Sequence, residues 1–157
     1  MNKIKVDNES TADNPVGRFM VAVGAVIVNS EGKVLLIKRS QKLDWHPGDW
    51  EIMYGRLAQH EDPITGLKRE VEEELSIAVT PLQPLTTWRI YRGHEETAEN
   101  ELIGITYYAT TGDAQVTISD EHSEYRWVTA EDALSLIKIG GIKRDINAYL
   151  DLQGPTL

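Results

Sequence analysis

Long apolar runs and short polar turns alternate over the first third of the chain. Residues 19–29 form a β-branched apolar run that is typical of a buried strand. Residues 30–33 contain Ser, Glu, Gly and Lys and indicate a turn, after which residues 33–39 predict the returning strand. A loop rich in turn residues is predicted over 40–50, and a short strand over 50–54.

Helical signals begin at Asp62. The dipeptide Asp62-Pro63 predicts an N-cap acceptor and a proline at the first position of a helix that runs to about Leu75. A second helix is predicted after Thr129, which with Asp132 resembles a capping box. Further strands are predicted over 85–91, 101–110 and 124–129, and a final helix over 142–152, after a break at Gly140 and Gly141. Because strands and helices mix without a regular βαβ alternation, the predicted fold class is α+β, with a mixed β-sheet sandwiched between helices.

The composition is that of one globular domain. The chain has 157 residues, of which 41% are hydrophobic and 26% are charged, and this length suffices for a stable core. The polar N-terminus predicts a flexible tail over residues 1–15 and a single domain over 16–157. The absence of cysteine excludes disulfides, thiolate nucleophiles and cysteine-based metal sites, and it is compatible with a cytoplasmic location.

The charge narrows the partners that we expect. The formal net charge is −9, and so acidic a chain repels phosphate backbones, which argues against nucleic acid as a partner. The first 15 residues contain no apolar run, so they predict neither a signal peptide nor a membrane span. A small anionic substrate would therefore need local help from Arg, Lys or a metal ion.

The helix predicted over 62–75 carries two different faces. One face is an apolar stripe, and Glu70, Glu73 and Glu74 share a second face beside it. One interpretation is a solvated acidic face with an Arg69–Glu73 surface ion pair. The other is a site for a hard divalent cation such as Mg²⁺ or Mn²⁺, whose charge would remove the repulsion between the carboxylates. The stripe itself consists of Ile64, Leu67, Val71 and Leu75.

A longer motif over residues 55–77 surrounds this acidic face. It resembles the Nudix box, which reads Gly, five residues, Glu, seven residues, then Arg-Glu-apolar-x-Glu-Glu-x-Gly-apolar, and eight of the nine defined positions match. Ser76 departs, since it stands where the family has Gly, and a left-handed conformation at this predicted helix end would cost Ser about 1 kcal/mol. The matching residues are Gly55, Glu61, Arg69, Glu70, Val71, Glu73, Glu74 and Ile77.

The resemblance implies a set of site residues within the box. Nudix enzymes hydrolyse diphosphates linked to another moiety with Mg²⁺ or Mn²⁺, and Glu70, Glu73 and Glu74 correspond to the metal-binding carboxylates. Glu70 or Glu73 is also the expected residue that orients or deprotonates the attacking water. Arg69 and Glu61 correspond to the pair that braces the loop on the helix, and Arg69 is included among the catalytic residues.

The resemblance also implies metal ligands outside the helix. The family usually adds a backbone carbonyl just before the box glycine, which here is that of Tyr54, although Met53-Tyr54 replaces the usual Pro-Gly. A further catalytic and metal-binding Glu often comes from a later loop. Glu121 is the first candidate for it, because it lies in a polar loop, and Glu124 is the second, because it begins the predicted strand.

Side chains outside the box choose the substrate. Arg39, Arg89 or Arg92 are candidates to meet phosphates, with a surface charge pair as the alternative. A tryptophan or tyrosine is a candidate to stack on a base, with ordinary packing as the alternative. We predict Arg39, Arg89 and Trp50 as the substrate contacts, ahead of Arg92, Trp45, Trp88 and Tyr91.

The predicted activity is metal-dependent hydrolysis of a nucleoside diphosphate linked to another moiety. Nucleoside triphosphates, sugar nucleotides and dinucleotides are the substrate types that the resemblance implies, and a homodimer is common for the family. The alternative is a Nudix-fold module that binds a ligand or regulates without hydrolysis. Such modules often lose box carboxylates, whereas this chain retains the complete set.

Overall fold

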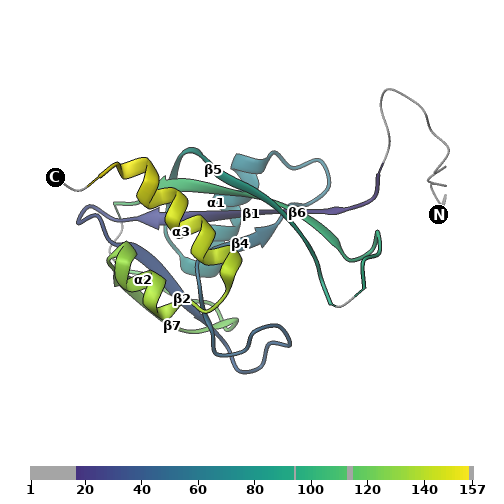
Figure 1. Cartoon of the computed structure of the whole chain (residues 1–157), viewed down its shortest axis with the longest axis horizontal. Coiled ribbons are helices and arrows are strands. Elements are labelled where there is room, and N and C mark those ends of the chain that lie inside the picture. Colours follow the sequence, from purple (N-terminus) through teal and green to yellow (C-terminus); the bar gives the residue numbers. More distant parts are fainter. Residues whose placement is uncertain (1–16, 94, 113–114, 156–157) are drawn as a thin grey trace.

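The computed structural model describes residues 17–93, 95–112 and 115–155, so the tail predicted over 1–15 lies outside the described residues. Strands and helices are mixed along the chain without a repeating βαβ order, as predicted (Figure 1). The elements are β1 (Met20–Val28), β2 (Val34–Arg39), β3 (Trp50–Glu51), β4 (Met53–Arg56), α1 (Pro63–Leu75), β5 (Thr80–Tyr91), β6 (Glu101–Thr110), β7 (His122–Val128), α2 (Ala130–Leu136) and α3 (Gly140–Gln153).

The seven described strands form one mixed sheet around β1. The order along the sheet is β3-β2-β1-β6-β5, with β4 paired to β1 and β7 paired to β2. β1 and β6 are parallel, and the other pairs are antiparallel. The early part of β1 pairs with β4, from Ala22 to Ala25, whereas its end pairs with β2 at Val28. This arrangement brings β4 beside the buried centre of the sheet.

Helices cover both faces of the sheet, which confirms the predicted sandwich (Figure 1). Side chains alternate along a strand, so Val23 and Ala25 of β1 pack toward α1, while Val26 and Val28 pack toward α2 and α3. In Figure 1, α3 (yellow) crosses in front of the strands. The two resulting apolar clusters hold the three helices in place on either side of the sheet.

Helix α1 begins and ends as the sequence predicts. The Asp62 carboxylate accepts hydrogen bonds from the backbone N–H groups of Ile64 and Thr65, at 3.0 and 3.1 Å. The helix ends at Ser76, which takes a left-handed conformation with φ 54°. A serine in this conformation costs about 1 kcal/mol relative to glycine, but the site residues lie earlier in the helix and are not displaced by it.

Two strand predictions were wrong in their bounds. β5 starts at Thr80 and not at 85, because its two prolines lie at register shifts in a strand at the end of the sheet, where proline is tolerated. The strand predicted over 50–54 is two short strands, since β3 pairs with β2 whereas β4 pairs with β1.

Two further boundaries also differ from prediction. Gly140 and Gly141 do not break the chain but form the first turn of α3, where a helix tolerates residues that its interior does not. β7 begins at His122 and not at Glu124, because His122 still pairs with Arg39 beyond an irregularity in the ladder. Glu121 is therefore the residue that directly precedes the strand.

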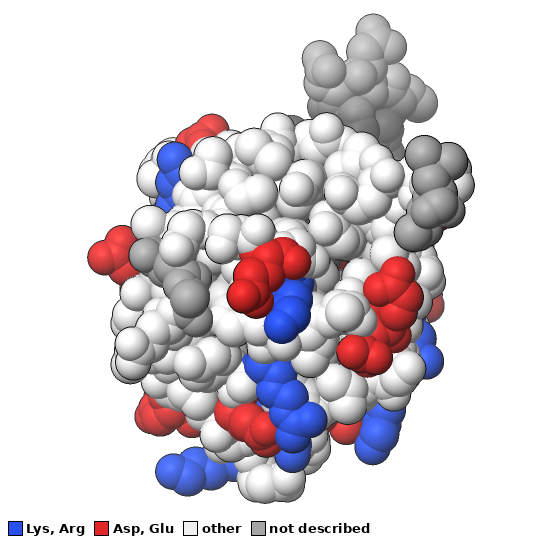
Figure 2. Space-filling view, turned by 90° about the vertical axis from the view of Figure 1, so that its left-hand side faces the viewer, with Lys and Arg blue, Asp and Glu red and all other residues white. Residues whose placement is uncertain are grey.

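Charged side chains of both signs are interspersed on the face shown in Figure 2. Among the described residues, no helix is long and apolar enough to cross a membrane.

Candidate active site

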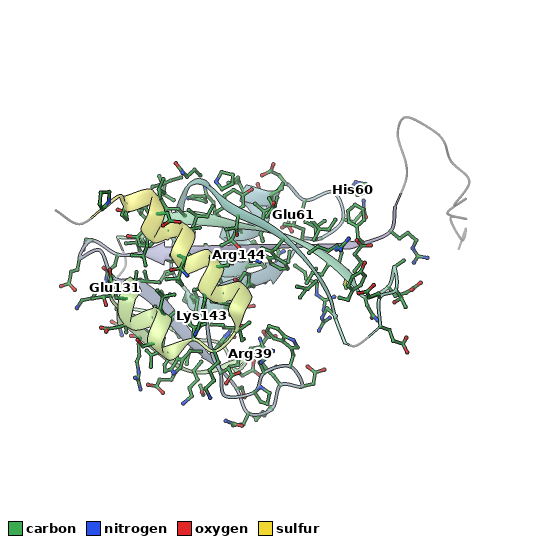
Figure 3. All side chains as sticks on the ribbon, viewed as in Figure 1. Arg39, His60, Glu61, Glu131, Lys143 and Arg144 are labelled. Atoms are coloured by element: carbon green, nitrogen blue, oxygen red, sulfur yellow. The ribbon has the colours of Figure 1, made fainter. Side chains whose placement is uncertain are left out.

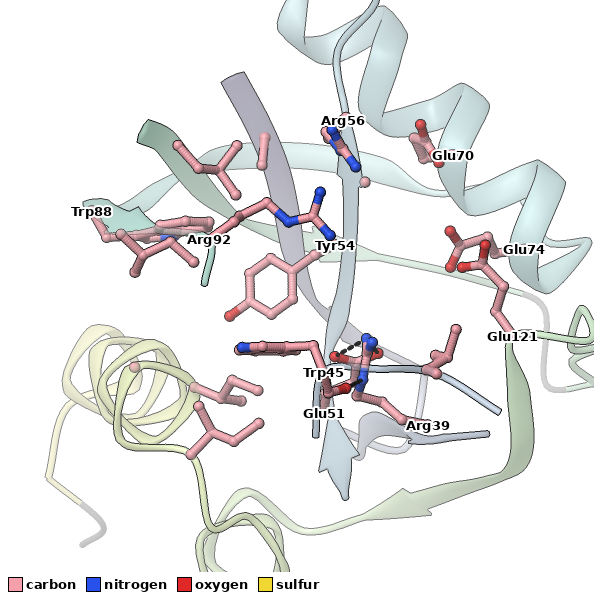
Figure 4. A pocket seen from close by; sticks show the side chains of 18 of the residues that line it. Arg39, Trp45, Glu51, Tyr54, Arg56, Glu70, Glu74, Trp88, Arg92 and Glu121 are labelled. Carbon is pink, nitrogen blue, oxygen red and sulfur yellow. Dashed lines mark hydrogen bonds and ion pairs between the residues drawn. The ribbon is translucent and has the colours of Figure 1, made fainter. Parts of the chain in front are cut away.

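A cavity of about 520 Å³ lies where α1, β4, β5 and the start of α3 approach one another (Figure 4). One end is acidic and is lined by Glu70, Glu74 and Glu121. The other end is aromatic and is lined by Tyr54 and Trp88, with Trp45 from the loop after β2. The site therefore combines carboxylates with flat apolar surfaces in one hollow.

Arg69 braces the loop before α1 against the helix. Its Nε donates to Glu61 Oε1 at 2.6 Å and its Nη2 to Glu61 Oε2 at 2.8 Å. Nη2 also donates to the carbonyl of Arg56, and the Glu61 carboxylate accepts the Ala58 N–H at 2.9 Å. The hydrogen bonds from Arg69 and from the Ala58 N–H lower the pKa of Glu61 to about 2. The two side chains are therefore joined as the resemblance implies, although their contribution to catalysis stays a prediction.

Glu70 lies against the glycine that opens the box. A Cβ at Gly55 would collide with the Glu70 carboxyl group, so only glycine leaves room for it there. Arg69 Nη1 donates to Glu70 Oε1 at 3.0 Å. Burial raises the pKa of Glu70, and the hydrogen bond from Arg69 opposes that shift. The loop and the helix thus hold this carboxylate at the cavity wall.

Glu74 and Glu121 point toward one another across the acidic end (Figure 4). Burial raises the pKa of Glu74 to about 8, and the charges of Glu121, Glu70, Glu51 and Glu73 add to the shift in that order. At neutral pH the folded chain therefore tends to keep a proton on Glu74. A bound cation would instead favour the ionised form.

The remaining predicted carboxylates lie further from the cavity. The Glu73 side chain is 58% exposed, pairs with Arg69 at 3.1 Å, and does not line the cavity. Glu124 does not line it either, since its carboxylate pairs with Arg126 at 2.8 Å and with Lys38 at 3.9 Å on the sheet surface. Of the two candidates for the later carboxylate, Glu121 is thus the one that the fold brings to Glu74.

The acidic end fits a divalent cation by its donor chemistry. Carboxylate oxygens are the ligands that Mg²⁺ and Mn²⁺ prefer. Here three carboxylates, whose like charges repel one another, line one cavity. Within the described ranges, however, no three His, Cys, Asp or Glu side chains already stand close enough to enclose an ion. The arrangement is therefore open, as suits an ion that shares water and substrate oxygens. Tyr54 and Gly55 line the same cavity, and a ligand role for the Tyr54 carbonyl stays a prediction.

A buried charged cluster of Arg39, Glu51 and His122 adjoins the acidic end. Glu51 accepts hydrogen bonds from Arg39 Nη1 at 3.1 and 3.3 Å, and it contacts His122 Nε2 at 3.0 Å. Arg39 Nε donates to the carbonyl of Trp45 at 2.6 Å, and its guanidinium lies 5.0 Å from the centre of that ring. Arg39 lines the cavity as predicted, but two of its three nitrogens already have partners within the protein.

The aromatic end is built on two glycines. The Tyr54 ring covers Gly24 of β1 and the Trp88 ring covers Gly104 of β6, at positions where a Cβ would collide with the rings. The two rings meet edge to face at 5.7 Å. Strands without side chains at these points therefore make space for an aromatic wall.

Asp145 anchors this wall from below. It is fully buried, and its Oδ2 accepts hydrogen bonds from Tyr54 Oη at 2.6 Å and from Thr106 Oγ1 at 2.8 Å. Its Oδ1 accepts from Thr86 Oγ1 at 2.6 Å and from the adjacent Arg144 at 2.9 and 3.0 Å. Figure 3 shows the position of Arg144 on α3. Because the Thr106 hydroxyl also accepts the indole N–H of Trp88 at 3.0 Å, one carboxylate orders both rings.

Two of the predicted substrate contacts do not reach the cavity. Trp88 and Ile90 of β5 line it, so Arg89 points to the other face, where its guanidinium lies 5.4 Å from the ring centre of Tyr91. Trp50 is buried among the core residues beside α2 and α3. The structure places Trp45, Trp88 and Arg92 at the cavity instead.

The sequence analysis ranked Trp88 and Arg92 below other candidates, and it assigned no role to Asp145 or His122. Period-two alternation from Trp88 to Arg92 signals that these two share a face, and it separates them from Arg89. Asp145 falls between Ile142 and Ile146 on the buried side of α3, and an acidic residue on an apolar stripe is itself a signal. His122 offers no comparable signal, because its partners come from distant parts of the chain.

Comparison with known proteins places this fold and this box in a family. A model of the NUDIX domain matches residues 18–150. The nucleoside triphosphatase NudI of Klebsiella pneumoniae is 30% identical over 114 residues, which cover 68% of this chain and 79% of that protein. An octanoyltransferase of Myxococcus xanthus is 30% identical over 118 residues, but the match spans only 32% of that longer protein and 74% of this chain.

A solved structure agrees with these sequence matches. The crystal structure of a MutT protein from Methanosarcina mazei Go1 has a TM-score of 0.72 and 27% identity, and the match covers 91% of this chain and all of that one. The family model covers more than half of the chain, and the box carboxylates Glu70 and Glu74 line one cavity. The chain therefore belongs to the Nudix hydrolase family.

Proposed function

We propose that this Nudix hydrolase cleaves a diphosphate bond in a nucleoside diphosphate linked to another group, with Mg²⁺ or Mn²⁺ as its cofactor. Nucleoside triphosphates are the first substrates to test, because NudI, which matches over 68% of the chain, is a nucleoside triphosphatase. Sugar nucleotides and dinucleotides are the next. We also expect a homodimer and a cytoplasmic setting, and the dimer can be tested by light scattering.

One observation carries the proposal. Glu70, Glu74 and Glu121 converge at one end of a cavity whose other end is formed by Trp88 and Tyr54. Carboxylates at one end suit a metal–phosphate complex, and aromatic rings at the other suit a base. Arg56 and Arg92 extend into the cavity between these ends (Figure 4). An elongated ligand with a flat group and a phosphate chain would match all three parts.

Each group has a role in the proposed reaction. A divalent ion, when bound, lowers the pKa of water and offsets phosphate charge. Glu70 is the better candidate to accept the proton of the attacking water, because it lines the cavity, whereas Glu73 is largely exposed. Arg69 holds Glu70 through Oε1. Arg92 is placed to bind phosphate oxygens.

A hydrolysis screen tests the proposal. The purified chain is incubated with nucleoside triphosphates, sugar nucleotides and dinucleoside polyphosphates, with Mg²⁺ or with EDTA, and the products are separated by chromatography. We expect cleavage that requires the metal. No cleavage across the panel, together with ligand-dependent thermal stabilisation, would instead identify a binding module.

A matched pair of variants locates the reaction. Glu74→Gln should lower the rate by about two orders of magnitude or more, because it removes a charge that faces the cavity. Glu72→Gln is the control, since Glu72 is exposed on the same helix and does not line the cavity. Equal rates for wild type and Glu74→Gln would show that the box is not the active site.

A further inference from the structure

His122 is buried in the charged cluster behind the acidic end. Its side chain is only 3% exposed. Nε2 lies 3.0 Å from Glu51 Oε1, while Nδ1 lies 3.9 Å from Glu74 Oε2, which is too long for a hydrogen bond. Among the described residues, Nδ1 has no hydrogen-bond partner. A buried nitrogen without a partner is costly, so this one is expected to have a use.

The two nitrogens have different surroundings. Glu51 already accepts hydrogen bonds from Arg39 Nη1, and an ionised Glu74 can also only accept. His122 can therefore hold both carboxylates only in its charged form, in which Nε2 donates to Glu51 and Nδ1 donates as well. This leaves Nδ1 directed toward Glu74. A shift of Glu74 by less than 1 Å would bring its carboxyl group within hydrogen-bond distance of Nδ1.

The backbone around His122 is held at several points. The carbonyl of Glu121 accepts the N–H of Ser40 at 2.8 Å, and the His122 N–H donates to the carbonyl of Ser119 at 3.2 Å. His122 also pairs in register with Arg39. The imidazole is therefore a fixed point next to both Glu121, its chain neighbour, and Glu74, on α1.

We propose that His122 is a positioning residue for the metal-binding carboxylates, and that Nδ1 holds Glu74 in place when the acidic end is loaded with a divalent cation. This inference rests on the proposed function. The contacts run from Arg39 through Glu51 and His122 to Glu74, so the cluster connects the acidic end to the loop that carries Trp45. Arg39 serves this cluster as a support.

Two amide substitutions separate this role from mere packing. The side-chain nitrogen of Asn takes about the place of Nδ1, whereas that of Gln reaches about the place of Nε2. If Nδ1 holds Glu74, His122→Asn should retain the function and His122→Gln should not. If His122 matters only through its hydrogen bond to Glu51, the order is reversed.

The test is Mn²⁺ binding without substrate, measured by isothermal titration calorimetry on the full chain. We expect His122→Gln to weaken Mn²⁺ binding about tenfold or more, and His122→Asn to stay within about threefold of wild type. His60→Asn is the matched control, because His60 is exposed and left-handed, a conformation that Asn tolerates. Urea unfolding of each variant shows whether it folds, and if His122→Gln does not, His122→Asn decides by itself.

The outcomes distinguish this inference from the proposed function. Wild-type affinity in His122→Gln, or a tenfold loss in His122→Asn, would overturn the role of Nδ1 while the metal site stands. No Mn²⁺ binding by the wild-type chain would overturn the metal dependence itself and this inference with it.

Discussion

Asp145 and Glu74 are both carboxylates held largely away from solvent, but the fold surrounds them differently. Asp145 accepts hydrogen bonds from four residues, which come from β4, β5, β6 and α3. Glu74 has other carboxylates as neighbours, and no described residue donates a hydrogen bond to its side chain. Burial and these charges raise the pKa of Glu74 to about 8.

The difference separates structure from function within one cavity. Buried polar groups are normally paired, and Asp145 follows this rule with partners from the chain itself. Glu74 departs from it, and such departures concentrate at functional sites, where the missing partner is a ligand. The aromatic wall is thus complete without a ligand, whereas in the proposed function the acidic end is completed by a divalent cation.

Removal of each carboxylate from the metal-free protein should affect stability differently. Asp145→Ala leaves the hydroxyl groups of Tyr54, Thr86 and Thr106 without their buried acceptor, so it should lower the free energy of unfolding by about 3 kcal/mol or more. Glu74→Gln removes a repelled carboxylate and should not lower it. Urea unfolding measures both variants. A larger loss of stability for Glu74→Gln than for Asp145→Ala would contradict the assignment of Asp145 to structure and Glu74 to function.

The pH dependence of stability should report on Glu74. Its pKa rises from 4.5 to about 8 in the folded chain, so between these pH values the folded state holds a proton that the unfolded chain has released. Rising pH therefore favours unfolding: this contribution is fully present below pH 4.5 and is lost as the pH passes through about 8. In EDTA, the melting temperature should fall as the pH rises from 4.5 to about 8.

Two variants check the origin of that fall. Glu74→Gln should flatten it, and Glu72→Gln should leave it unchanged, because Glu72 is exposed. Saturating Mg²⁺ should raise the melting temperature most at the alkaline end, where Glu74 is ionised and ready to bind. A slope that survives in Glu74→Gln would assign it to another group.

The aromatic wall should affect substrate binding more than the chemical step. Trp88→Leu removes a ring from the cavity and should raise KM for a nucleoside triphosphate about tenfold, with a smaller change in kcat. Trp50→Leu should leave KM within about twofold of the wild-type value, because Trp50 packs in the core, on the side of β3 opposite to the cavity-lining Glu51. Steady-state kinetics decides, and the reverse order would restore the prediction that Trp50 meets the substrate.

A substitution at the end of α1 should affect neither the acidic end nor the aromatic wall. Ser76→Gly relieves a left-handed serine and should raise the free energy of unfolding by about 1 kcal/mol. The slope of stability against pH and the KM should stay as in wild type. Lower stability in Ser76→Gly would show that the serine makes a compensating contact.

Local patterns carried most of what the sequence could predict. Asp62 and Ser76 each act on neighbours in the chain, so the start and the end of α1 followed from local signals, and its acidic face followed from helical spacing. The mixed sheet between helices also followed from the order of the elements. The bounds of β5 and β7 and the division between β3 and β4 were missed because strand pairing decides them, and the start of α3 was placed two residues too late.

The long-range part of the site could not be predicted in the same way. Tyr54 and Asp145 are 91 positions apart, and His122 and Glu51 are 71 positions apart. No spacing rule joins such residues, so their shared clusters appear only in the folded chain. Trp50 was predicted as a contact because the sequence does not show that its neighbour Glu51, on the opposite side of β3, is the residue that lines the cavity.

The two prolines of β5 have a consequence for self-association. β5 stands at the end of the described sheet, where a strand from another molecule would otherwise add and begin edge-to-edge aggregation. Pro81 and Pro84 have no N–H to donate, and the register shifts beside them interrupt the regular ladder. Any strand addition is therefore confined to the stretch from Thr86 to Tyr91, which is too short to template an extended intermolecular sheet along the whole edge.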